Sequence, residues 1–314
     1  MDYYGQLPKY PINRPLTEAE RADQLQQKKR VEIDPHYNLS VIRINSTYLE
    51  IVDKYYAWKG GALLISVVVI LIASIALGTV AALVINKWDM ATIENRQGSL
   101  GALFVAALVF LPLIIYSIWL ALRETFTYTH YPIRLNRKTR MVYVFRRDGT
   151  ILSVPWDDLF FTLNKATRDW NVRGHVLDVD GVTVKETFAF PMYDDLKSEL
   201  LLYWEFVRRY MEDGPAKLIG SGDGQVNICH PIADRKESFG WSMHLIYSHF
   251  APVPIMLWIF SPFLTLVGLA RYLAHLTCDV PEWPKRINDS CVIEPGDPYE
   301  RDARHNSPNL KRWA

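Results

Sequence analysis

Cysteine is scarce in this sequence. Its three cysteines, Cys229, Cys278 and Cys291, are too few for the disulfide framework of a small secreted domain. A single disulfide between Cys278 and Cys291 could form if the C-terminal tail faces an oxidising compartment. We favour the alternative of three free thiols in a reducing compartment.

An excess of charge of either sign is also missing. The formal net charge is +1, so the chain has no surplus of basic residues with which to neutralise phosphates, and we predict no nucleic-acid partner. An apolar segment near the start is lacking too, because residues 1–59 are polar and charged. We therefore expect no cleaved signal peptide, and the first membrane segment should act as an uncleaved insertion signal.

Motifs for catalysis and cofactor binding are absent as well. The chain has neither a Gly-x-Ser-x-Gly elbow nor a His-Glu-x-x-His pair. The glycines of 220–224 lack the strand, helix and lysine of a phosphate loop, so a linker is the better interpretation. The Asp157–Asp158 pair follows Pro155–Trp156 and is typical of a turn. We expect no enzymatic activity, no catalytic residues and no cofactor.

One group of Cys and His residues could in principle bind zinc. Its members carry ligand chemistry but do not occur in the paired spacing of a zinc site, and they are Cys229, His230, His244, His249, His275 and Cys278. Packed or interfacial histidines explain them better, and we expect no metal.

Two long apolar runs dominate the sequence. Residues 60–86 and 97–122 contain no charged side chain and are bounded by Lys59, Lys87, Arg96 and Arg123. At 1.5 Å per residue the first reaches roughly 40 Å, enough to cross a bilayer core of about 30 Å. The short connection makes them antiparallel neighbours. We predict a transmembrane helical hairpin over residues 60–122.

The flanks of this hairpin indicate its orientation. More Lys and Arg residues lie before the first helix and after the second than in the connection, so both flanks should be cytoplasmic. The aromatic side chains of Tyr55, Tyr56 and Trp58 precede the first helix and are candidate interfacial anchors.

Alternating apolar residues after the hairpin predict a soluble sheet-and-helix domain over 123–216. Six strands are expected, at 132–135, 141–146, 150–154, 160–164, 172–178 and 182–190. Asp148–Gly149 and Asp180–Gly181 are strong hairpin turns. An amphipathic helix follows from about Tyr193 to Met211. This order is close to that of a pleckstrin-homology-like domain, although one strand short, and gives an α+β membrane protein.

The remaining segments complete the predicted organisation. Residues 1–59 form a cytoplasmic N-terminal segment with a polar helix from Thr17 to Arg30, opened by a capping box of Thr17 and Glu20, and residues 45–56 lead into the first membrane helix. Residues 217–237 are a linker. Residues 238–277 are a membrane-associated apolar region, which prolines divide into helices near 241–249 and 255–270.

The depth of this apolar region is left open. The helix over 255–270 is long enough to span most of a thin bilayer, to re-enter it or to lie in its interface, and we favour a membrane-associated element that does not span or is only partly inserted. Residues 278–314 form a polar tail that either wraps over the soluble domain or remains loose.

Several short stretches together carry a resemblance. They are NSTYLEIVDKYYAWKG, YPIRLNRKTRMVYVFRRDG, VPWDDL, PEWPKRI and CVIEPGDP. As a set, over residues 40–300, they resemble a poorly characterised family of bacterial membrane proteins that carries a domain of unknown function. Members are often encoded beside type VI secretion genes, which implies an accessory or immunity role toward an antibacterial effector. The family has no agreed catalytic residues, so the resemblance implies none for this chain.

Three functions follow from these observations. The first is an inner-membrane interaction protein, with the lipid bilayer and a secreted effector or secretion component as partners. The second is a membrane-lipid or signal sensor, for which the candidate headgroup contacts are Arg134, Arg137, Lys138, Arg140, Arg146 and Arg147. We favour the alternative that these residues are solvated charges of turns and strands. The third is a lipid- or peptidoglycan-acting enzyme that would use polar groups such as His244, His249 and Asp158.

Overall fold

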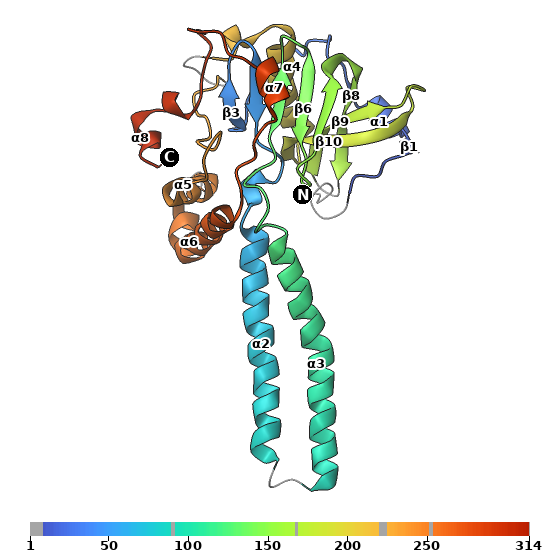
Figure 1. Cartoon of the computed structure of the whole chain (residues 1–314), viewed down its shortest axis with the longest axis vertical. Coiled ribbons are helices and arrows are strands. Elements are labelled where there is room, and N and C mark those ends of the chain that lie inside the picture. The colour runs from blue at the N-terminus through green and yellow to red at the C-terminus, as the bar shows by residue number, and fades with distance from the viewer. Residues whose placement is uncertain (1–8, 89–91, 167–168, 220–224, 251–253, 314) are drawn as a thin grey trace. The chain divides into compact units, whose positions relative to one another are not determined.

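The computed structural model describes residues 9–88, 92–166, 169–219, 225–250 and 254–313 (Figure 1). Its described residues divide into two compact units. Unit 1 consists of residues 1–57, 128–240 and 280–314, and unit 2 of residues 58–127 and 241–279. Each unit therefore joins segments that are distant in the sequence.

Unit 1 contains a five-stranded antiparallel sheet of order β3-β4-β5-β6-β7. Its strands are β3 (Val41–Ile44), β4 (Tyr48–Ile51), β5 (Ile133–Asn136), β6 (Met141–Phe145) and β7 (Ile151–Pro155). β4 pairs with β5 with Leu49 opposite Leu135, although the two apolar helices α2 and α3 separate these strands in the chain. Alternating Val and Ile residues fit the buried face of such a sheet.

The second sheet of unit 1 is also antiparallel, in the order β1-β10-β9-β8-β2. It consists of β1 (Arg14–Pro15), β2 (Gln24–Leu25), β8 (Leu159–Ala166), β9 (Asp169–Leu177) and β10 (Thr183–Asp194). The turn glycines Gly149 and Gly181 adopt positive φ, 80° and 66°, as the Asp-Gly dipeptides predicted. All six strands expected after the apolar hairpin are confirmed.

One helix closes the core of unit 1. α4 (Lys197–Glu212) buries Tyr203, Trp204 and Phe206 in a single apolar cluster that contains residues of both sheets. The ring of Trp204 stacks on that of Trp156, with centroids 5.8 Å apart. These large rings supply much of the buried apolar area that stabilises the unit.

The C-terminal tail also belongs to unit 1. Its helix α7 (Lys285–Ser290) and the preceding Trp283 cover Tyr48 and Tyr143 of the first sheet in a second apolar cluster. The 3₁₀ turn η4 (Ala303–His305) and the helix α8 (Pro308–Lys311) follow in the tail. Further short 3₁₀ turns lie elsewhere in the chain, at η1 (Tyr56–Trp58), η2 (Trp156–Asp158) and η3 (Pro215–Lys217). Of the two expectations for the tail, the packed one is confirmed.

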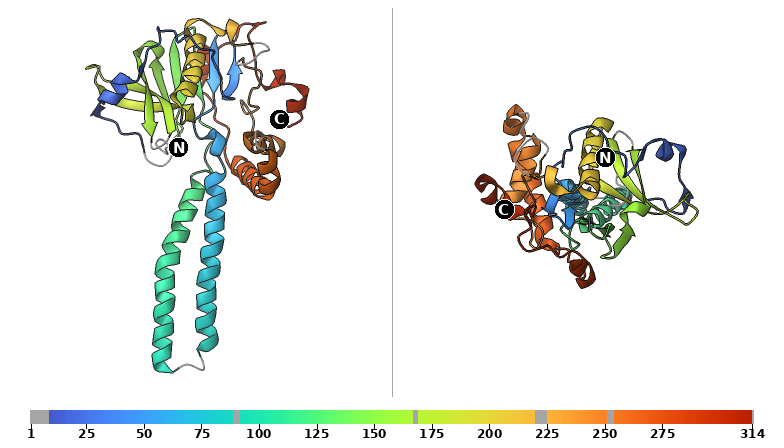
Figure 2. Two further views of the ribbon diagram at one scale, coloured as in Figure 1. Left: turned by 180° about the vertical axis from the view of Figure 1, so that it is seen from behind. Right: turned by 90° about the horizontal axis from the view of Figure 1, so that it is seen from above.

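Unit 2 is helical (Figure 2). It contains α2 (Gly61–Lys87), α3 (Ile93–Leu122), most of α5 (Phe239–Phe250) and α6 (Pro254–Thr277). α2 and α3 run side by side and agree with the predicted hairpin, with Pro112 accommodated inside α3. Three helical stretches are long and apolar enough to cross a membrane, namely 56–87, 93–122 and 257–277.

Several predicted boundaries are wrong. α1 (Glu18–Ala22) has the predicted Thr17 capping box but ends early, because Gln24 and Leu25 pair with β8. Residues 45–56 contain β4 rather than a simple lead into a helix. α4 begins after residues 193–194, which extend β10. Tertiary pairing overrides local helix signals in these places.

The third apolar region forms two helices as predicted, but the second is longer. α6 begins at Pro254, a favourable first helical position for proline, and continues past Pro262 to Thr277. The glycines of 220–224 lie outside the described residues.

Candidate functional site

The expected membrane anchors occupy three different environments. Tyr55 is half-buried with the Lys54 ammonium 5.8 Å from its ring centroid, and Trp58 is 56% exposed. Tyr56 is buried within unit 1, where its hydroxyl donates to Glu237 Oε1 at 2.5 Å and its ring packs edge-on against His230. Tyr56 therefore closes an internal polar cluster, and of the three only Trp58 presents most of its side chain outward.

Arg134, the first of the candidate headgroup contacts, is an interior residue. It is buried, its Nη2 lies 3.1 Å from Glu50 Oε2, and its guanidinium is within 4.7 Å of the ring centroids of Tyr48 and Trp283. Trp283 Nε1 donates to the other Glu50 oxygen at 2.6 Å. The hydrogen bond of Trp283 to Glu50 and its ring contact with Arg134 therefore connect the tail to this buried ion pair of the first sheet.

Three more of the basic candidates pair with carboxylates. Arg140 binds Asp157 through two hydrogen bonds of 2.5 and 2.6 Å and also contacts Glu212. Arg146 lies 3.0 Å from Glu186, and Lys138 pairs with Glu294. The pair between Lys138 and Glu294 is exposed and contributes little to stability. These charges are locally neutralised.

The remaining two basic candidates are half-buried. Arg137 donates its backbone N–H to Thr47 O at 2.8 Å and lies beside Gly214, and Arg147 adjoins the Asp148–Gly149 turn. The six basic side chains thus do not converge on one site, and their contact with lipid stays a prediction.

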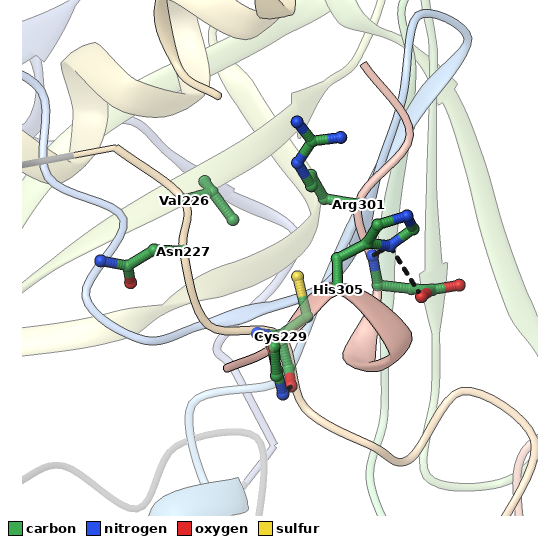
Figure 3. A pocket seen from close by; sticks show the side chains of 7 residues that line it. Val226, Asn227, Cys229, Arg301 and His305 are labelled. Atoms are coloured by element: carbon green, nitrogen blue, oxygen red, sulfur yellow. Dashed lines mark hydrogen bonds and ion pairs between the residues drawn. The ribbon is translucent and has the colours of Figure 1, made fainter. Parts of the chain in front are cut away.

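A pocket in unit 1 brings together residues that the sequence did not single out (Figure 3). It has a volume of about 160 Å³ and lies between the segments 226–229 and 301–306. Its lining residues are Val226, Asn227, Cys229, Arg301, Asp302, His305 and Asn306. This small space suits a single polar group or a short side chain.

Backbone pairing holds the two walls of the pocket together. Asn306 Oδ1 accepts the Cys229 N–H at 2.8 Å, and Asn306 Nδ2 donates to the Cys229 carbonyl oxygen at 2.8 Å. Arg301 exchanges two backbone hydrogen bonds with Ile44 of β3, at 2.8 and 3.0 Å. The tail therefore extends the first sheet at its β3 edge and fixes the position of the pocket.

The charged side chains that line the pocket, Asp302 and Arg301, differ in how they are paired. Asp302 is buried and carries two partners, with His305 Nδ1 3.1 Å and Arg304 Nε 2.8 Å from its carboxylate oxygens. Burial by itself raises the pKa of Asp302, but the hydrogen bonds from Arg304 more than offset this, so its pKa is lowered and its charge is balanced. The Arg301 guanidinium donates to the Glu300 carbonyl oxygen and makes no ion pair among the described residues.

The thiol in this pocket is not an activated nucleophile. Burial raises the pKa of Cys229 to about 12, and the nearby Asp302 carboxylate acts in the same direction. A thiol with such a pKa is protonated at neutral pH, whereas catalysis requires the thiolate. The Cys229 thiol therefore lacks the activation that a nucleophilic cysteine needs.

The other residues considered for metal binding are separated. Cys229 and His230 belong to unit 1, where His230 Nε2 lies 2.5 Å from the Leu39 carbonyl oxygen, whereas His244, His275 and Cys278 belong to unit 2. Over the described ranges no three His, Cys, Asp or Glu side chains form a group that could hold a metal ion. The His249 side chain lies outside the described residues. All three cysteines are free and buried.

Sequence reasoning missed this pocket because its walls are 77 residues apart in the chain. One signal could have indicated it. Residues Glu300–Asn306 of the tail are dense in charged and polar side chains and contain no proline, unlike the rest of this Pro-rich tail.

Comparison with known proteins gives one family. No curated protein and no solved structure matches the chain. A family model described as a family of unknown function, DUF6708, matches residues 108–295, which include the second half of α3, the strands β5 to β10, and the helices α4 to α7. The chain belongs to this family of unknown function.

Proposed function

We propose that this protein is a membrane-anchored, non-enzymatic interaction protein. One observation carries the proposal: the most apolar stretches of α2 and α3 have mean hydropathies of 2.9 and 2.5, yet only 11% and 6% of these stretches are buried inside the protein. Apolar helices of this length that no protein covers belong in a bilayer.

The charge distribution supports a binding rather than a catalytic role for unit 1. Its acidic and basic side chains are largely used in internal pairs, and the Cys229 thiol is held in its protonated form. The Arg301 guanidinium, beside His305 and Asn227 in the pocket, is the charged group best placed to receive a partner's carboxylate. We propose this pocket as part of the partner-binding surface.

The strand order supports a pleckstrin-homology-like description of unit 1. β4 to β7 form successive antiparallel neighbours in one sheet, β8 to β10 do so in the other, and α4 follows. β4 adds the one strand by which the sequence-based count fell short of this fold. That count included only strands after the apolar hairpin, whereas β4 precedes the hairpin. Four of the six basic candidates are already paired with carboxylates of this chain, so they are less available to lipid phosphates. A protein is therefore a better choice of ligand than a lipid headgroup.

The family resemblance adds the finer part of the proposal. It supports a bacterial inner-membrane location with unit 1 in the cytoplasm, and a type VI secretion effector or secretion component as the first partner to test. In that case the protein acts as an immunity or accessory factor.

The test is a mild-detergent pull-down of the tagged full-length protein from its native membranes, with quantitative mass spectrometry. The wild type is compared with Arg301→Ala and with a control, Arg286→Ala, whose arginine is exposed on α7 outside the pocket. We expect a stoichiometric protein partner that both wild type and control retain and that Arg301→Ala loses by about tenfold or more, as for a truncated interfacial charge.

Two results would contradict the proposal in different ways. A partner retained equally by Arg301→Ala would remove the pocket from the binding surface. A preparation that carries only lipid would remove the interaction function itself.

A further inference from the structure

α6 meets α2 at one end only. A Cβ atom placed on Gly60, the residue that precedes α2, would lie 2.4 Å from both Arg271 Cα and Arg271 N and 2.9 Å from the Ala270 carbonyl carbon. The backbones of the two helices therefore touch at the first turn of α2. In Figures 1 and 2, α6 lies across this end of α2, whereas α3 follows α2 along its length.

This crossing decides how α6 can meet a bilayer. α2 leaves the crossing point and continues for 27 residues, and α6 extends 17 residues from Arg271 back to Pro254, roughly 26 Å at 1.5 Å per residue. A helix that spans beside α2 would pack along it over several turns. A helix that lies across the first turn of a spanning α2 is instead placed at the membrane surface.

The two faces of α6 differ. One face is covered, because Gly268 packs against Met243 of α5, Tyr247 of α5 donates to the Ser261 carbonyl oxygen at 3.1 Å, and Leu264 is buried. The other face is an uncharged stripe whose members recur every three or four residues and are 40–66% exposed. They are Ile259, Phe263, Leu266, Leu269, Leu273 and Leu276.

We infer that α6 is an in-plane membrane helix that inserts this stripe into the boundary between lipid headgroups and acyl chains. The inference rests on the membrane anchoring of α2 and α3 proposed above. The occupant of the stripe is lipid, because α6 contacts the start of the apolar helix α2 in the same unit and the stripe carries no charge for a polar partner. Trp258, 86% exposed near the start of α6, suits the same interface.

The assignment departs from what length and composition indicate for this segment. The most apolar stretch of residues 257–277 has a mean hydropathy of 1.5, below that of the corresponding stretches of α2 and α3, and 28% of it is buried, more than in either. Both values fit a helix with one protein-covered face and one lipid-facing stripe. The protein-covered face also accommodates Arg271 and His275, which are fully buried in an otherwise apolar helix.

Depth measurement tests the inference directly. Single cysteines are introduced at Ile259→Cys, Leu266→Cys and Leu273→Cys, labelled with a small fluorophore, and the full-length protein is reconstituted into phosphatidylcholine–phosphatidylglycerol vesicles. The three native cysteines are buried, so the introduced thiol is the accessible one. Quenching is compared for lipids that carry a spin label near the headgroup or near the chain end.

We expect all three positions to be quenched equally, and more strongly by the headgroup-proximal label. If α6 spans, Leu266→Cys is quenched most by the chain-end label while the two outer positions remain shallow, and the inference is overturned. Quenching by aqueous iodide with none by either lipid label overturns it as well.

A control in α3 separates this inference from the anchoring on which it rests. Leu108→Cys lies midway along α3 and is 64% exposed, so the chain-end label should quench it most. If Leu108→Cys is deep and the α6 positions are not uniformly shallow, only the assignment of α6 fails. If Leu108→Cys is not quenched by lipid labels, the anchoring itself fails. Each variant is first shown to be monodisperse by size-exclusion chromatography.

Discussion

Gly60 is the position where a single methyl group should cost the most. Its φ of +93° lies in a region that disfavours side chains, and an added Cβ would collide with the Arg271 backbone at 2.4 Å. Backbone atoms of a packed helix cannot move aside as a flexible side chain can. The strain of positive φ costs about 1–2 kcal/mol and the overpacking about 1–3 kcal/mol, so Gly60→Ala should destabilise unit 2 by roughly 2–5 kcal/mol.

Thermal unfolding of the detergent-purified protein measures this effect. For a chain of this size we expect the melting temperature of Gly60→Ala to fall by roughly 5–15 °C. Gly61→Ala is the matched control, because it is the next residue, has an ordinary φ and has no atom within 4 Å of the added Cβ. The control should be neutral or slightly stabilising, since alanine favours a helix over glycine.

The packing argument would be refuted if Gly60→Ala unfolded at the same temperature as Gly61→Ala. The contact between the start of α2 and residues 270–271 would then not exist in the folded protein, and the crossing of the two helices would lose its main support.

Other predictions concern buried charges. Arg134→Ala leaves Glu50 buried without its cation and should lower the free energy of unfolding by about 3–5 kcal/mol in a denaturant titration, whereas a lipid-contacting arginine could be removed without this loss. Burial lowers the pKa of His175 below its usual value, so this histidine contributes stability that is complete above pH 6.5 and is lost as the pH falls; the wild-type melting temperature should decline from pH 7 to pH 5 by more than that of His175→Gln. Burial raises the pKa of Glu124, whose Oε2 accepts two backbone N–H groups at the start of α2 at 3.0 and 2.9 Å. Its protonated form therefore contributes stability that is complete below the usual pKa of 4.5 and is lost as the pH rises through the folded pKa, so Glu124→Gln should flatten the pH–stability profile in melts from pH 4.5 upward.

The location of the pocket shows why sequence reasoning stops short of a site. Arg301 and Asn306 lie in a tail whose composition suits solvent exposure, and Cys229 follows a glycine-rich linker. They meet because the Arg301 backbone forms hydrogen bonds with the edge strand β3 and the Asn306 side chain forms hydrogen bonds with the Cys229 backbone. Edge pairing between remote segments has no local sequence signal, so the site was invisible before the fold was known.

The apparent basic cluster illustrates the opposite error. Arg134, Arg140 and Arg146 are close in sequence and resemble a membrane-facing patch, yet each reaches a different carboxylate, on β4, at η2 and on β10. Strand alternation and hairpin turns direct neighbouring side chains to different surroundings. Proximity in sequence therefore did not translate into a shared surface.

The sequence by itself determined the apolar hairpin, the six later strands and the turns at Gly149 and Gly181. These features depend on local physics: uncharged length, alternation of period two and glycine's access to positive φ. Only the tertiary structure decided that β4 pairs with β5 across the apolar hairpin, that the tail completes unit 1, and that α6 lies across α2. Each of these depends on contacts between segments far apart in the chain, where complementary packing, and not local preference, selects the partner.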